Sequence, residues 1–175
     1  RRRKNKDSKN YQTFRKKKEF NNQLDKCYLL LGKAYFYKKK YTMANNTFRF
    51  IQRQYAEDEA LMTEVSIWLF RSLTEMGRYE EAARIMDRLD GSTLKRKQRE
   101  MVAAARTDFY VRQGMYEQAI PEAERLVRTC KSIKRKPRYN FLLSQLYVKE
   151  NQDGAAKLAL KKATRFNFNY EMVFN

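Results

Sequence analysis

The chain has 175 residues, of which 42% are hydrophobic and 14% aromatic, and it carries a formal net charge of +19 without a single histidine. Its apolar content suffices for a folded core and excludes disorder throughout. The absence of histidine removes the commonest general base, every His-containing triad and most zinc sites, and no GxGxxG, GxxxxGK[ST] or GxSxG motif occurs. We therefore expect a non-enzymatic protein that has no cofactor, no bound metal and no small-molecule substrate.

A strongly basic segment comes first. Residues 1–18 hold ten Lys and Arg and one acidic residue. Because like charges this dense repel each other and little apolar material is present, we expect 1–20 to be a flexible tail or loop. The candidate contact residues in it are Arg1, Arg2, Arg3, Lys4, Arg15, Lys16, Lys17 and Lys18.

Four copies of one pattern follow the basic segment. GRYEEA at 77–82 returns as GMYEQA at 114–119, and four alanines mark the copies at intervals of 38, 37 and 37 residues. Such a period indicates stacked helix pairs. The anchoring alanines are Ala44, Ala82, Ala119 and Ala156. We expect repeat units at about 22–59, 60–97, 98–134 and 135–170, with the start of a further helix to 175.

The first copy carries the clearest motif. Tyr28, Leu31, Gly32 and Tyr35 precede Ala44 and Phe48 with the spacing of the tetratricopeptide pattern W-x2-L-G-x2-Y…A-x3-F, which they resemble. The prediction for 21–175 is an all-α tetratricopeptide-repeat solenoid, a right-handed superhelix of about four helix pairs. Small residues let the helices approach, and Gly77 and Gly114 are expected to end first helices in a left-handed conformation.

Partners of such a solenoid usually bind its concave face, which the first helices line. Counting from Gly32 as position 8 of its unit gives the groove positions 2, 5, 9, 12 and 13, and we expect about half of them to pack against a neighbouring unit instead. They are Lys26, Leu29, Lys33, Phe36, Tyr37, Glu64, Ile67, Arg71, Thr74, Glu75, Met101, Ala104, Asp108, Val111, Arg112, Arg138, Phe141, Gln145, Val148 and Lys149.

Further basic clusters occur at 38–40, 95–99 and 131–138. A solvated surface is the preferred interpretation; an acidic protein partner or anionic lipid comes next, and nucleic acid last. The cysteines Cys27 and Cys130 lie 103 residues apart and show no CxxC spacing, so we interpret them as unpaired, small, buried hydrophobic residues.

Two blocks carry a more specific resemblance. DKCYLLLGKAYFY at 25–37 and NYEMVFN at 169–175 resemble the PorW/SprE proteins, which are tetratricopeptide-repeat outer-membrane lipoproteins of the type IX secretion and gliding-motility machinery. The resemblance extends over roughly 22–175. It implies an accessory scaffold at the periplasmic face of the outer membrane that links the periplasmic ring to the translocon, with other type IX secretion subunits as protein partners.

The chain begins without Met and ends where a fifth unit would start, so we expect a piece of a longer protein. A signal peptide and a lipid-bearing cysteine would then lie outside it, and membrane association would come from that lipid anchor. The alternative function is that of a basic helical-repeat protein that binds nucleic acid, which we consider unlikely, or an anionic membrane surface.

Overall fold

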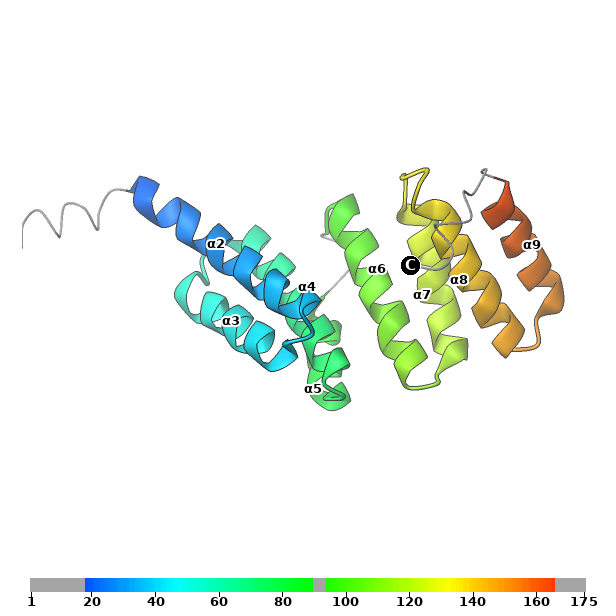
Figure 1. Ribbon diagram of the computed structural model, residues 1–175, viewed down its shortest axis with the longest axis horizontal. Helices are drawn as coiled ribbons and strands as arrows, with labels where there is room; N and C mark the ends of the chain where they lie inside the picture. Colours follow the sequence, from blue (N-terminus) through cyan, green and yellow to red (C-terminus); the bar gives the residue numbers. More distant parts are fainter. Residues whose placement is uncertain (1–17, 90–93, 166–175) are drawn as a thin grey trace, which may run out of the picture. The chain divides into compact units, whose positions relative to one another are not determined.

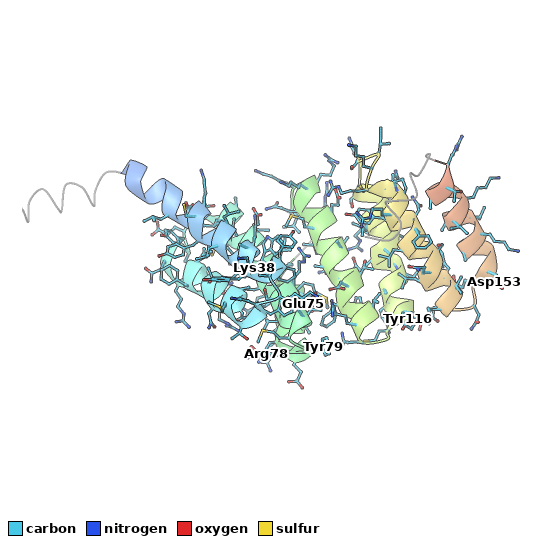
Figure 2. All side chains as sticks on the ribbon, in the orientation of Figure 1. Lys38, Glu75, Arg78, Tyr79, Tyr116 and Asp153 are labelled. Atoms are coloured by element: carbon cyan, nitrogen blue, oxygen red, sulfur yellow. The ribbon has the colours of Figure 1, made fainter. Side chains whose placement is uncertain are left out.

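The computed structural model describes residues 18–89 and 94–165, which form eight α-helices and contain no strand (Figure 1). The helices alternate with short turns, as predicted for a chain of helix pairs. Helix α2 begins at Lys18, so the predicted boundary at residue 20 lies inside a helix. The helices are α2 (Lys18–Tyr37), α3 (Tyr41–Gln54), α4 (Glu59–Glu75), α5 (Tyr79–Arg88), α6 (Arg96–Arg112), α7 (Tyr116–Thr129), α8 (Lys136–Lys149) and α9 (Asp153–Thr164).

The chain divides into two compact units, Arg1–Arg78 and Tyr79–Asn175, so the boundary lies within the second predicted repeat. In the first unit α2 packs on α3, α3 packs on α4, and α2 also contacts α4. In the second unit α6, α7, α8 and α9 pack in chain order and lie side by side in Figure 1. Within each unit, neighbours in sequence are neighbours in space, as in helical-repeat proteins.

Small and large side chains alternate in both cores. In the first unit Gly32 faces the ring of Phe48, and a Cβ atom added to this glycine would lie within 2.8 Å of the ring atom Cζ. Ala44 and Phe48 are fully buried on α3. The second unit has a core of three small and three larger residues, namely Ala119, Ile120, Ala123, Leu143, Leu146 and Ala159. The small residues therefore allow close helix approach, as the repeat pattern predicted.

The turn after each first helix has the same backbone conformation in all four repeats. The residue at this point has a positive φ, at Lys39 (58°), Gly77 (71°), Gly114 (72°) and Asn151 (55°). The next residue donates its N–H to the carbonyl five residues earlier, over 2.8–2.9 Å. These bonds complete the left-handed helix ending that Gly77 and Gly114 predicted, and Lys39 and Asn151 adopt it without being glycine.

Arg106 joins three helices of the second unit. Its Nη2 donates to the carbonyls of Met86 and Leu89 at 3.1 and 3.2 Å, and its Nη1 lies 3.4 Å from Oε1 of Glu122 on α7. A guanidinium group beside carbonyls at a helix C-terminus is favoured by the helix dipole. The side chain therefore ties the end of α5 to α6 and α7.

Candidate partner-binding surfaces

The predicted groove positions of α2 and α4 divide into buried and exposed residues. The structure places Leu29, Phe36, Ile67 and Thr74 in the core, and a partner could reach them only after rearrangement. Tyr37 is 70% exposed, and the remaining positions, Lys26, Lys33, Glu64, Arg71 and Glu75, are exposed or half-exposed. The four buried residues are thus among those expected to pack against other helices.

Six side chains of α2 and α4 form one group, which we call the Arg71 cluster: Lys33, Phe36, Tyr37, Glu64, Trp68 and Arg71. Lys33 Nζ lies 2.6 Å from Glu64 Oε1, which links the two helices by an ion pair. The rings of Phe36 and Trp68 meet edge to face at 5.3 Å, and the Tyr37 ring lies 5.8 Å from that of Trp68. Five of the six residues were predicted to line the groove.

Arg71 is the chemically distinctive member of the Arg71 cluster. Its guanidinium group lies 4.4 Å from the ring centroid of Trp68 and 4.7 Å from that of Phe36. Within the described part of the chain, these ring contacts are its interactions, and no carboxylate or carbonyl accepts from its N–H groups. Trp68 is 4% exposed and its Nε1 atom has no hydrogen-bond partner there either. Because Trp68 Nε1 is buried, the unused donors that suit a carboxylate ligand are those of Arg71.

The predicted groove face of the second unit is more accessible on α8 than on α6. All five positions of α8 are exposed, including the apolar side chains of Phe141 and Val148; the other three are Arg138, Gln145 and Lys149. On α6, Met101, Ala104, Asp108 and Val111 are half-buried. Arg112 is exposed, and its Nε lies 3.1 Å from Asp108 Oδ2.

A cavity of about 280 Å³ lies between α7, α8 and α9, where the sequence predicted no site. The Tyr147 hydroxyl donates to Glu124 Oε1 over 2.6 Å at its edge, and burial together with this bond raises the pKa of Tyr147 to about 12. The prediction missed the cavity because only first-helix groove positions were counted. The lining residues are Glu124, Val127, Arg128, Asn140, Leu143, Tyr147, Ala155, Leu158, Ala159 and Lys162.

Both thiols are free, but they differ in exposure. Cys130 is buried, as interpreted, and burial raises the pKa of its thiol. Cys27 is exposed on α2, so the interpretation of this residue as a buried hydrophobic residue is wrong.

Other predicted features can be placed only in part. Lys18 begins α2, while Arg1, Arg2, Arg3, Lys4, Arg15, Lys16 and Lys17 lie outside the described residues, so contact through the basic segment stays a prediction. Among residues 18–89 and 94–165, no three His, Cys, Asp or Glu side chains gather as metal ligands would. The helices described there include none with the length and apolarity needed to cross a membrane.

Comparison with known proteins identifies the repeat. A family model of the tetratricopeptide repeat matches residues 137–170, a stretch that includes α9 and nearly all of α8. No curated protein matches the sequence. Together with the consecutive helix pairs, the match confirms the predicted all-α tetratricopeptide-repeat solenoid. Repeats of this kind are typical of scaffolds that bind other proteins and have no enzymatic activity.

Proposed function

We propose that the chain is a scaffold subunit of the type IX secretion and gliding-motility machinery. It would act at the periplasmic face of the outer membrane, between the periplasmic ring and the translocon, anchored through a lipid outside this sequence. The tetratricopeptide repeats support binding to protein partners, and the blocks at 25–37 and 169–175 support the assignment to this machinery. The alternative, a basic repeat protein that binds nucleic acid, has only the net charge of +19 in its favour.

The observation that carries the proposal is the free set of donors on Arg71. The guanidinium of Arg71 lies over the rings of both Trp68 and Phe36, which pre-orients it, so little side-chain entropy is lost when a ligand binds. A carboxylate of a partner could accept from it in bidentate fashion, a bond worth roughly 1.5–3 kcal/mol for charged groups. The exposed ring of Tyr37 lies 5.8 Å from that of Trp68 and suits an apolar neighbour of that carboxylate. The partner segment we expect is therefore acidic with flanking apolar residues.

The test is a substitution of Arg71 in the full chain. We expect Arg71→Gln to weaken recovery of type IX ring or translocon subunits about tenfold or more, because the loss of one such charged bond exceeds 1.4 kcal/mol. Tagged protein would be incubated with a detergent-solubilised, nuclease-treated envelope extract at raised salt, and bound proteins identified by mass spectrometry. Reversing the charge of Lys33 or Arg112 would be less informative, because Lys33 pairs with Glu64 and Arg112 pairs with Asp108.

Arg53 provides a matched control, because it is an exposed arginine in the last turn of α3 of the same unit. Arg53→Gln should leave recovery unchanged. Trp68 is the sole tryptophan of the chain, so its fluorescence reports on the Arg71 cluster directly. Acidic test peptides with Leu or Phe beside Glu should alter this fluorescence, and their Gln counterparts should not. Equal recovery with Arg71→Gln and wild type, or no type IX subunit at all, would contradict the proposal.

A further inference from the structure

Two basic segments far apart in sequence meet at one end of the second unit. The segments 95–99 and 131–138 contain no Asp or Glu. Eight of their Lys and Arg side chains are exposed, and we call these the basic end: Lys95, Arg96, Lys97, Arg99, Lys131, Lys134, Arg135 and Arg138. In Figure 1 the start of α6 and the yellow loop between α7 and α8 lie at the same end of this unit.

Specific contacts hold the two segments together. Arg96 Nη1 donates to the carbonyl of Thr129 over 3.5 Å, and Arg135 Nη1 lies 2.9 Å from Oε1 of Glu100. Glu100 is buried on α6, and its Oε1 also lies 3.5 Å from the Tyr139 hydroxyl. Its carboxylate pairs with Arg135 from below the surface, so no acidic side chain is exposed among these cations. The first turns of α6 and α8 contain no acidic residue, and their N-termini add positive potential here.

The loop between α7 and α8 presents an aliphatic side chain among these cations. Ile133 is 70% exposed, and it lies between Lys131 and Lys134. Buried Cys130 and Pro137 fix the two ends of the loop. The carbonyl of Ser132 accepts from the N–H of Lys136 over 2.9 Å, which closes the turn. Such a loop presents Ile133 without having to be ordered on binding.

We propose that the basic end is a docking surface for an anionic phospholipid bilayer, with Ile133 inserted into the headgroup region. Each Lys or Arg near an anionic bilayer contributes about 1 kcal/mol of attraction, and an aliphatic side chain gains further free energy when it leaves water. The docking goes beyond the proposed scaffold function and requires no protein partner. It would orient the second unit on a membrane surface by a contact separate from any lipid anchor.

The exposed isoleucine favours a bilayer over nucleic acid. A nucleic-acid surface that lacks base-edge contacts uses aromatic rings for stacking next to its cations. The exposed large apolar residue between the cations of the basic end is the aliphatic Ile133 instead. Tyr139 is half-buried against Glu100, and the exposed ring of Phe141 follows Arg138 by nearly one turn of α8, outside both basic segments.

The experiment measures co-sedimentation of the full chain with vesicles of phosphatidylcholine and phosphatidylglycerol, at an ionic strength of about 0.15 M. We expect Ile133→Ser to lower the partition coefficient about tenfold, which one aliphatic side chain can supply. Removing three lysines, Lys97→Gln, Lys131→Gln and Lys134→Gln, should lower it about a hundredfold. Wild type should not bind vesicles of phosphatidylcholine alone.

Matched controls separate the contribution of the basic end to vesicle binding from that of the N-terminal basic segment. That segment is present in every variant. Leu30→Ser removes an aliphatic side chain of similar exposure, 68%, from the first unit, and should leave partition unchanged. Lys38→Gln, Lys40→Gln and Lys157→Gln together remove the same charge from exposed sites elsewhere, and should lower partition no more than about threefold.

Three results would overturn the proposal: wild-type partition of Ile133→Ser, equal losses in the two lysine triples, or binding to a DNA duplex without binding to anionic vesicles. Circular dichroism of each variant shows whether the helices are intact. The substituted side chains are exposed, so their loss should leave the fold unchanged.

Discussion

Tyr147 connects two repeats of the second unit through one hydroxyl group. It lies on α8 and donates to Glu124 on α7, at the edge of the cavity that α9 completes. The bond joins a neutral donor to a carboxylate, a type worth about 1.5–3 kcal/mol. Oε2 of Glu124 also lies 3.5 Å from Arg128 Nη1, so each carboxylate oxygen has a partner.

We expect Tyr147→Phe to lower the free energy of unfolding by about 1–2 kcal/mol at pH 8. The folded pKa of Tyr147, about 12, lies above the ordinary tyrosine value of 10.0. The stabilisation is therefore complete below pH ~10 and is lost as pH rises through ~12. Urea unfolding at pH 8 and pH 11 measures the change, and the difference between variant and wild type should shrink at the higher pH.

Tyr116→Phe is the control for this prediction, because Tyr116 packs on the same core and makes no hydroxyl hydrogen bond within the described residues. The loss of the Tyr116 hydroxyl should change the free energy of unfolding little at either pH. A Tyr147→Phe protein as stable as wild type at pH 8 would mean that the bond to Glu124 contributes nothing.

At the residue scale, the sequence predicted well which side chains share a face, but it predicted poorly which of them are accessible to a partner. Counting repeat positions from Gly32 placed Lys33, Phe36 and Arg71 on the face where the structure finds them together. It could not predict that Phe36 is buried or that Arg71 lies over its ring, because burial depends on what neighbouring helices contribute. Trp68 is not one of the predicted groove positions, and its contact with Arg71 emerges only from the packing of α4 on α2.

At the scale of elements, the left-handed turn after each first helix is the most regular feature. Glycine at 77 and 114 predicted two of these turns, and the other two have Lys39 and Asn151. The alanine spacing of 38, 37 and 37 residues contained the missing signal. This spacing maps Gly77 onto position 39 and Gly114 onto position 151. The repeat spacing therefore identifies the two turns that lack a glycine.

We expect Lys39→Gly to stabilise the protein by about 0.5–1 kcal/mol. A left-handed backbone costs an L-residue roughly 1–2 kcal/mol, partly offset by the larger entropy of glycine in the unfolded chain. Asn151→Gly should give a smaller gain, since asparagine tolerates this conformation. Gly77→Ala should cost about 1 kcal/mol through the backbone alone, because nothing lies within 4 Å of the added Cβ.

Thermal unfolding of these variants measures the effect. Lys38→Gly is the matched control, because it makes the same chemical change one residue earlier, where φ is not positive. It should destabilise by about 0.5–1 kcal/mol. If Lys39→Gly and Lys38→Gly shift the melting temperature in the same direction, the left-handed turn is not what limits stability here.

At the scale of the whole molecule, charge opposes folding. A net charge of +19 on 175 residues creates repulsion that a compact state increases. Two of the ion pairs of the described residues have both side chains exposed, Arg112 with Asp108 and Arg128 with Glu124, and such pairs contribute about 0–1 kcal/mol each. Because the repulsion is summed over the whole chain, it outweighs these few attractions.

We therefore expect added NaCl to stabilise the protein, with a melting temperature that rises between about 0.02 and 0.5 M as screening shortens the range of repulsion. Replacing Lys38, Lys40 and Lys157 with glutamine lowers the net charge by three at exposed sites. This triple variant should melt at a higher temperature than wild type in low salt and respond less to NaCl. A melting temperature that falls as salt rises would contradict this prediction. It would mean that local ion pairs such as Lys33–Glu64 and Arg135–Glu100 dominate the electrostatics, and that the excess positive charge does not lower stability.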